Sequence, residues 1–203
     1  MGHKPLPPDS PPDSARIHHA ARILAQGGVI AYPTEGVYGL GCDPWNRAAV
    51  NRLLRLKGRP RAKGLILIAA DWETLDPLMA PLSDAEHRRL HQVRNQPVTW
   101  VVSAAPEAPS WVRGSHQTIA LRVTDHPVAA ELCRAFRRPL VSTSANPAGE
   151  PTARRSVEVR QYFGDRLDML LSGPLGDAPG PSEIRDLRTN EVLRPGSGTS
   201  GSG

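Results

Sequence analysis

The stretch RLLRLKGRPRAKGLILIA, residues 52–69, carries three patterns in direct succession. Its leucines continue a helical pattern that starts upstream, and Gly58 and Pro60 end that helix. Residues 64–69 form an unbroken apolar run between turns, which is typical of a strand buried on both faces. A helix, a turn and a buried strand in succession predict an α/β protein.

The same alternation of helices and strands continues along the rest of the chain. We expect helices that begin at Ser14, near Asp43 or Asn46, at Ser83 with a Glu86 capping box, at Asp125 or His126, and over 156–163. We expect strands over 29–32, 64–69, 98–104, 118–123, 139–143, 168–172, 184–187 and 191–193, with a glycine-rich loop after the first. The adjacent strands late in the chain indicate a sheet with both parallel and antiparallel pairs.

Length and composition fit one domain with flexible ends. We place this domain at 14–195, between a disordered tail at 1–13 and a flexible tail at 196–203. The net charge of +5 favours anionic partners such as nucleotides or nucleic acid, and two distant cysteines argue against a disulfide framework. No apolar run approaches the roughly 18 residues of a membrane span, and no signal peptide is evident. We therefore expect a cytoplasmic protein with no membrane partner.

The turn KGRPRAK, residues 57–63, is the first candidate for a binding site. Lys57, Arg59 and Lys63 lie on a segment that a glycine and a proline keep out of the helix. A turn fixed between a helix and a strand can aim several cations at one point, and Arg and Lys together suit a triphosphate. A solvated turn without a ligand is the alternative.

The glycine-rich stretch YPTEGVYGLGCD, residues 32–43, follows a predicted strand. Thr34 and Glu35 come just past the strand end, where open α/β sheets bind ligands. The glycines match neither the dinucleotide fingerprint nor the Walker loop. A tight strand-to-helix turn is therefore the simpler interpretation of the glycines.

A third polar segment, VSTSAN at 141–146, follows another buried strand. Ser142, Thr143, Ser144 and Asn146 offer hydroxyls and an amide that could bind phosphate, ribose or a small polar substrate. A serine nucleophile is an alternative, although the G-x-S-x-G elbow is missing, and an ordinary Asx or Ser/Thr turn is another.

Arg122 lies inside the aliphatic strand 118–123. An unpaired cation there would be costly, so Arg122 is expected either in a buried ion pair or as an anion ligand. The seven histidines show no H-E-x-x-H spacing, and we predict no metal site built by the protein.

These segments occur in the same order in a known family. YPTEGVYGLGCD, LKGRPRAKGLILIA, QPVTWVV, IALRVTDHP, PLVSTSAN and PSEIRDL together resemble the YrdC/Sua5 family over residues 15–195. The resemblance is greatest to its short, single-domain threonylcarbamoyl-AMP synthases. It implies an α/β fold with a twisted mixed sheet and flanking helices around a basic cavity.

The resemblance also implies a nucleotidyltransferase. Members join L-threonine, bicarbonate and ATP into L-threonylcarbamoyl-adenylate and pyrophosphate, for N6-threonylcarbamoylation of adenosine 37 in tRNAs that read ANN codons. Mg²⁺ would arrive through the ATP phosphates, and TsaB, TsaD and TsaE would be downstream partners. The alternative is a non-catalytic module for double-stranded RNA or tRNA, or for ribosome maturation, which the basic composition permits.

The family's motifs map onto individual positions of this chain. They assign catalysis to Lys57 and Arg59. They assign ATP to Lys57, Arg59, Lys63, Thr118, Ser144, Asn146 and Arg194, and L-threonine to Thr34, Arg122, Ser142 and Ser182. Two departures put details in question: the usual WPGPVT reads RNQPVT at 94–99, and the second threonine of PTET is Gly36.

Overall fold

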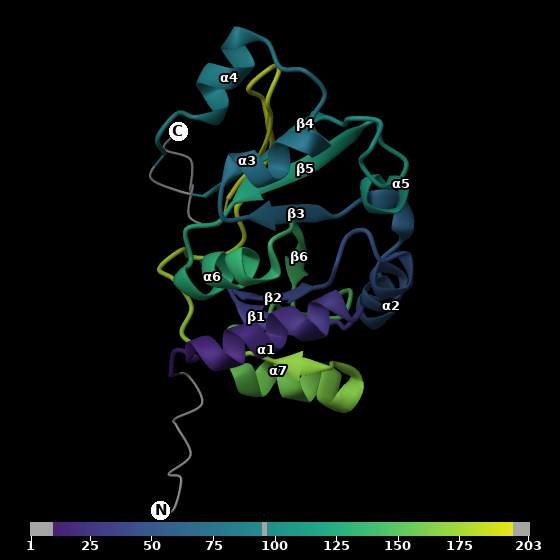
Figure 1. The fold of residues 1–203 in the computed structure, drawn as a ribbon, viewed down its shortest axis with the longest axis vertical. Coiled ribbons are helices and arrows are strands. Elements are labelled where there is room, and N and C mark those ends of the chain that lie inside the picture. The colour runs from purple at the N-terminus through teal and green to yellow at the C-terminus, as the bar shows by residue number, and fades with distance from the viewer. Residues whose placement is uncertain (1–9, 95–96, 197–203) are drawn as a thin grey trace, which may run out of the picture.

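A twisted nine-stranded sheet runs through the computed structural model, which describes residues 10–94 and 97–196 (Figure 1). The strand order is β7-β1-β2-β6-β3-β5-β4-β8-β9. The strands are β1 (Ile30–Pro33), β2 (Tyr38–Gly41), β3 (Ile66–Ala69), β4 (Val98–Ser103), β5 (Thr118–Val123), β6 (Leu140–Ser144), β7 (Met169–Leu170), β8 (Glu183–Asp186) and β9 (Val192–Arg194).

The sheet is mixed, as the sequence predicts. Strands β1 and β7, β3 and β5, and β4 and β8 pair in parallel, whereas the other neighbours pair antiparallel. The expected α/β class is therefore confirmed. The expectations for the tails fall largely on 1–9 and 197–203, which lie outside the described residues. Of the RNQPVT departure at 94–99, residues 95–96 also lie outside them, whereas Val98 and Thr99 begin β4.

Helices cover the sheet and close its ends. They are α1 (Ser14–Ala25), α2 (Arg47–Lys57), α3 (Trp72–Leu75), α4 (Asp84–Leu90), α5 (Ser110–Arg113), α6 (Pro127–Phe136) and α7 (Ser156–Phe163), with the 3-10 turns η1 (Arg61–Lys63), η2 (Asp76–Leu78) and η3 (Gly164–Arg166). Within the described ranges, every helix is too short or too polar to cross a lipid bilayer. The four-residue helices α3 and α5 were not predicted, because one turn is too short to show a period.

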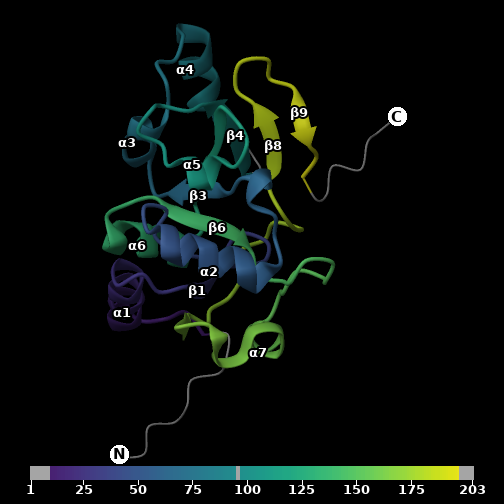
Figure 2. The ribbon, with the colours of Figure 1, turned by 90° about the vertical axis from the view of Figure 1, so that its right-hand side faces the viewer.

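Helices α1 and α6 pack together against one face of the sheet, at left in Figure 2. Ile17 and Leu24 of α1 share an apolar core cluster with Leu132 of α6 and Ile30 of β1. The cap of α1 corrects the sequence prediction: Asp13, not Ser14, is extended, and its carboxylate accepts the Arg16 N–H at 2.8 Å. Ser14 already has helical geometry, so its side chain cannot take the cap position.

The larger core cluster joins α2, α5 and α7 to strands β1 to β6. Helix α2 begins where the sequence predicts, because the Asn46 side chain accepts the Ala49 N–H at 3.0 Å. It ends at Gly58, whose φ of 60° lies in the left-handed region that glycine favours. The end of α2 therefore delivers the KGRPRAK turn directly to β3.

The glycine-rich loop predicted after β1 is partly wrong. Residues 38–41 form β2, which pairs antiparallel with β1 and β6. Gly41 is needed for packing rather than for a turn, since an added Cβ would lie 2.7 Å from the Val141 carbonyl and 2.8 Å from the Tyr32 ring. Glycines that admit a neighbouring side chain look the same in sequence as glycines of a loop.

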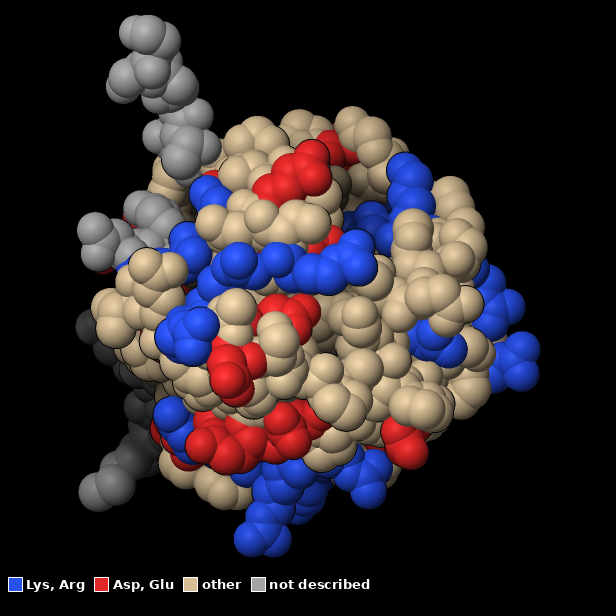
Figure 3. All heavy atoms as spheres, turned by 90° about the horizontal axis from the view of Figure 1, so that it is seen from above, with Lys and Arg blue, Asp and Glu red and all other residues tan. Residues whose placement is uncertain are grey.

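Charges of both signs share the surface seen from above the molecule. Figure 3 shows Lys and Arg side chains in a band with Asp and Glu on both sides of it. Such alternation weakens any single-sign field over that face. The face seen in Figure 3 therefore presents no extended field of one sign.

Candidate functional site

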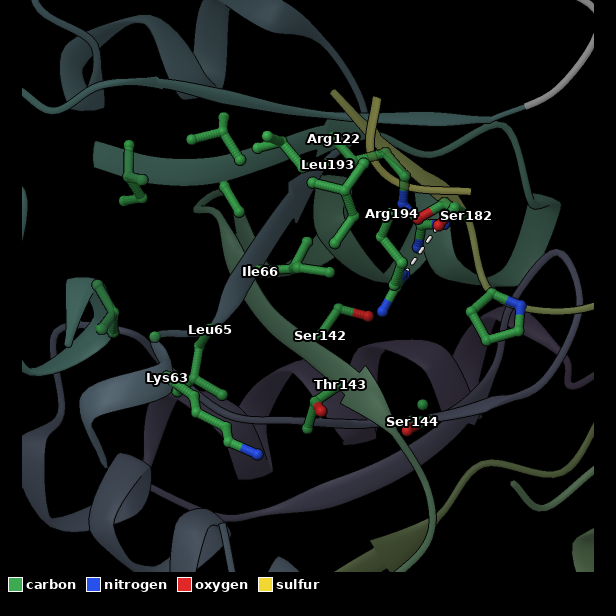
Figure 4. Close-up of a pocket in the computed structure, with 18 of the residues that line it drawn as sticks. Lys63, Leu65, Ile66, Arg122, Ser142, Thr143, Ser144, Ser182, Leu193 and Arg194 are labelled. Carbon is green, nitrogen blue, oxygen red and sulfur yellow. Dashed lines mark hydrogen bonds between the residues drawn. The ribbon is translucent and has the colours of Figure 1, made fainter. Parts of the chain in front are cut away.

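A cavity of about 390 Å³ lies over the middle of the sheet. Strands β3, β5 and β6 form its floor, and the segment 173–182, here called the strap, contributes one wall (Figure 4). Five cationic side chains of the described chain line it: Arg59, Lys63, Arg113, Arg122 and Arg194. This cavity joins segments that are far apart in sequence, so the fold is what gathers them.

The structure brings most of the predicted site residues to this one cavity. Those that line it are Thr34, Arg59, Lys63, Thr118, Arg122, Ser142, Ser144, Ser182 and Arg194. Lys57 and Asn146 lie just behind the wall, where they bind each other. The division of these residues between ATP and threonine stays a prediction.

Arg59 is held at the cavity by its own turn. Its Nε and Nη2 donate to the Gly64 carbonyl at 3.2 and 2.9 Å, which folds the guanidinium back along the chain. Burial lowers the pKa of Arg59, although the group stays cationic at any physiological pH. Lys63, by contrast, is exposed at the mouth and free to follow a ligand.

Lys57 is buried and binds the turn behind the cavity wall, and it does not line the cavity itself. Its Nζ donates to the Ser144 carbonyl, to the Asn146 carbonyl at 2.8 Å and to the Asn146 amide oxygen at 3.3 Å. Burial, followed by the charge of Arg59, lowers the pKa of Lys57 to about 8. In this structure the ammonium therefore ties the end of α2 to the turn after β6.

The turn after β6 is fixed by a chain of hydrogen bonds. Ser144 Oγ donates to Asn146 Oδ1 at 2.7 Å, and Asn146 Nδ2 donates to the Glu150 carbonyl at 2.7 Å. Both ends of the Asn146 amide already have hydrogen-bond partners in the protein. Asn146 would therefore influence a ligand by orienting Ser144, which lines the cavity. The partner of the Ser144 hydroxyl is an amide oxygen, which is not a base that could activate a nucleophile.

The opposite wall places hydroxyl groups beside a cation. Thr99 and Ser182 share a hydrogen bond at 2.7 Å. Arg194 Nη2 donates to the Ser182 carbonyl at 2.8 Å (Figure 4). Partial desolvation, followed by the charges of Arg59 and Arg122, lowers the pKa of Arg194. Three cations thus act on the same space, which favours an anion there.

Arg122, the cation inside strand β5, is paired with a carboxylate. Its Nη1 lies 3.2 Å from Glu35 Oε2, so the buried ion pair is present. Arg122 also lines the cavity, and its role as an anion ligand stays a prediction. Burial raises the pKa of Glu35, but Arg122 and the Thr124 hydroxyl outweigh burial and hold it below the ordinary value. Glu35 is therefore ionised at neutral pH.

Sequence reasoning missed two polar residues at the cavity, Arg113 and His116. Arg113 ends α5, and His116 lies in the loop that follows. Backbone hydrogen bonds join this segment to the KGRPRAK turn and the residues after it: Ser115 N–H donates to the Ala62 carbonyl at 3.2 Å, and Leu65 N–H donates to the Val112 carbonyl at 2.8 Å. No local pattern announces such long-range backbone bonds. The only signal for this segment in the sequence is a basic residue, Arg113, next to a glycine, Gly114. In the structure that glycine has a φ of 68°.

Across residues 10–94 and 97–196, no group of three or more His, Cys, Asp and Glu side chains is placed to hold a metal ion. Mg²⁺ often keeps its water and binds through substrate phosphates. A magnesium ion carried in by a nucleotide stays a prediction.

The fold and cavity define an α/β protein with a cationic, hydroxyl-rich binding site over the centre of a mixed sheet. The model of the Sua5/YciO/YrdC family, described as "Telomere recombination", matches residues 22–196. The chain belongs to this family.

Curated relatives extend over nearly the whole chain. A threonylcarbamoyl-AMP synthase of Cellvibrio japonicus is 54% identical over 180 residues, which are 89% of this chain and 95% of the relative. One of Pseudomonas aeruginosa is 54% identical over 182 residues, 90% of this chain and 98% of the relative.

Solved structures match in three dimensions as well. The structure of P. abyssi Sua5 complexed with L-threonine matches with a TM-score of 0.84 at 29% identity. The match covers 91% of this chain and 55% of the Sua5 chain. E. coli YciO has a TM-score of 0.78 at 29% identity and covers 94% of this chain and 93% of its own.

Proposed function

We propose that this chain is a nucleotidyltransferase that forms L-threonylcarbamoyl-AMP and pyrophosphate from L-threonine, bicarbonate and ATP. The observation that carries the proposal is that one cavity gathers Arg59, Lys63, Arg122 and Arg194 with hydroxyl groups from four separate segments. The names of the relatives that are 54% identical support the same activity. The product would serve threonylcarbamoylation of adenosine 37 in tRNA, with TsaB, TsaD and TsaE acting downstream.

The reaction needs positioning and charge neutralisation more than side-chain acids or bases. The threonine amine and bicarbonate condense to a carbamate with loss of water. A carbamate oxygen then attacks the α-phosphorus of ATP, and the bond to the leaving pyrophosphate breaks. Fixed cations around the transferring group stabilise the charge that develops on the phosphate oxygens.

The residues divide between the two substrates by their chemistry. Arg59 and Lys63 lie on the turn that suits a triphosphate, and Ser144 adds a hydroxyl beside it. Arg122, Ser142 and Ser182 offer a cation and two hydroxyls, a set that fits an amino acid with a carboxylate and a hydroxyl. Mg²⁺, when bound with ATP, would share the neutralisation of the phosphates.

Pyrophosphate release by the purified chain tests the proposal. We expect release only when L-threonine, bicarbonate and ATP are all present, and near-complete loss in the Arg59→Ala variant. Release at the same rate without threonine would assign the chain to a different ATP-cleaving reaction. A well-folded chain that releases no pyrophosphate from the full mixture would overturn the proposal.

A further inference from the structure

We propose that Glu35 is a positioning residue, which holds Arg122 in the orientation that receives the carboxylate of the amino-acid substrate. Glu35 itself does not line the cavity, so it would act only through Arg122. The inference rests on the proposed function, since it takes L-threonine as the substrate whose carboxylate Arg122 meets.

The ion pair between Glu35 and Arg122 is built into the wall of the cavity. Glu35 follows β1 and Arg122 belongs to β5, and three strands separate these two in the sheet. Their side chains are 12% and 9% exposed, and Nη1 lies 3.2 Å from Oε2. Charges so far from water are retained only when each has a partner, so neither side chain can leave the other without cost.

Glu35 is itself fixed on two sides. Thr124 Oγ1 donates to Glu35 Oε1 at 2.6 Å, and the Ala178 N–H of the strap donates to the Glu35 carbonyl at 2.9 Å. Thr124 comes two residues after Arg122, so both side chains start from the same face of the extended chain. Thr124 holds the carboxylate, and the carboxylate in turn holds the guanidinium.

The guanidinium keeps donors for a ligand. Nη1 makes the ion pair with Glu35, and the Arg122 side chain also lines the cavity. Within the described chain its Nε has no hydrogen-bond partner, but this atom is enclosed by the protein and out of reach of a ligand. Arg has five N–H donors in one plane and binds a carboxylate best through two of them. An arginine that lines the cavity and is already oriented by a fixed carboxylate would meet an incoming carboxylate with the donors that it does not commit to Glu35.

A purely structural role would make a different prediction from a positioning role. If Glu35 only neutralised Arg122 for folding, its loss would lower stability and the amount of active protein but not the KM for threonine. If the negative charge itself were needed, Glu35→Gln would behave like Glu35→Ala. Positioning requires an acceptor oxygen at the same place, and Gln retains one.

Steady-state kinetics of variants of the whole chain separate these roles. We expect Glu35→Ala to raise the KM for L-threonine about tenfold, the effect of losing one hydrogen bond to a charged group, while the KM for ATP stays within about twofold. We expect Glu35→Gln to stay within about threefold of the parent KM for threonine. Asp168→Ala is the matched control, because it breaks an ion pair with Arg52 away from the cavity.

A second pair of variants covers the case in which Glu35→Ala does not fold. Thr124→Val removes the hydroxyl that holds Glu35, and Thr124→Ser retains it. We expect a raised KM for threonine in the first, by about threefold or more, and the parent value in the second.

Two outcomes would overturn the inference: an unchanged KM for threonine in both Glu35→Ala and Thr124→Val, or equal effects of Glu35→Ala and Glu35→Gln. A parent chain that releases no pyrophosphate would instead overturn the proposed function.

Discussion

Lys57 is a buried cation whose partners are uncharged. Three oxygens surround its Nζ, two from backbone carbonyls and one from the Asn146 side chain, and none carries a full charge. Without a carboxylate to offset burial, the charged form is disfavoured, which is why its pKa falls to about 8. The same ammonium fixes the turn that presents Ser144 to the cavity.

We expect the turnover number to fall as pH rises through about 8, because Lys57 then loses the charge that strengthens its hold on the Ser144 and Asn146 carbonyls. A pH profile of turnover measures this. The profile of Lys57→Arg should lack the falling limb, since Arg keeps its charge well above that pH. The same limb in both proteins, or a parent profile that is flat through pH 8, would contradict the assignment.

The stability of the fold should respond in the opposite direction. The folded pKa lies below the ordinary Lys value, so between the two the unfolded chain binds more protons than the folded one. The contribution of Lys57 to the free energy of unfolding therefore increases with pH from about 8 upward. A loss of turnover over this range would then not reflect unfolding caused by Lys57.

Ser144 is expected to position a substrate rather than to attack it. Its hydroxyl donates to the Asn146 amide oxygen, so no base activates it. We expect Ser144→Ala to lower turnover by the worth of one or two hydrogen bonds, roughly 1–3 kcal/mol or up to about a hundredfold. A covalent adduct on Ser144 detected by mass spectrometry, with activity lost by a factor near 10⁶, would point to nucleophilic catalysis instead.

At the scale of the elements, the turn between β1 and β2 and the strap are built against each other. The Gly176 and Ala178 N–H groups donate to the Thr34 and Glu35 carbonyls at 3.1 and 2.9 Å. A Cβ on Gly36 would lie 2.9 Å from the Ala178 carbonyl oxygen and closer still to that of Gly180. The absence of a side chain at this position therefore lets the strap approach the cavity.

Gly36→Ala should push the strap away from the turn. We expect a loss of about 1–3 kcal/mol in the free energy of unfolding. We also expect a raised KM for L-threonine, because Ser182, the last residue of the strap, lines the cavity and would move with the strap. Thermal unfolding and steady-state kinetics measure the two effects. Gly28→Ala is the control, since its Cβ would press on Ile23 outside the cavity and should cost stability alone. A Gly36→Ala chain with the parent KM would show that the close approach does not shape the site.

Local signals made the helix boundaries predictable. The Asn46 and His126 caps, the Ser83–Glu86 capping box and Gly58 each depend on neighbours within four residues, and all are present in the structure. Strand β2 was missed in part because Gly41 makes room for the Val141 carbonyl and the Leu140 side chain, which come about a hundred residues later in the sequence. Propensity within a short window cannot register contacts with residues a hundred positions away.

The same distinction applies to the site. The polar segments were recognisable one by one, and the family motifs named nine residues that do line the cavity. The neighbours of those residues were not predictable: Lys57 faces carbonyls and Glu35 faces Arg122 because of how β1, β5 and β6 are ordered in the sheet. A motif indicates residue types, whereas the contacts of each residue come from the whole fold.

At the scale of the whole molecule, the strand order decides where charge accumulates. The central strands β6, β3 and β5 bring their cavity-facing residues under the strap, while β9 at one edge adds Arg194. The outer face in Figure 3 mixes charges of both signs, whereas the cavity holds five cations with one carboxylate behind Arg122. Such a cavity is suited to a substrate that carries several negative charges and releases some of them as pyrophosphate.

The central claim is that this cavity joins three substrates into one adenylate. Mass spectrometry of the products formed from ATP, L-threonine and isotopically labelled bicarbonate tests it most directly. We expect a threonylcarbamoyl-adenylate that carries the label, formed together with an equal amount of pyrophosphate. Consumption of ATP with no labelled adenylate, in a chain that is folded and binds the nucleotide, would contradict the account.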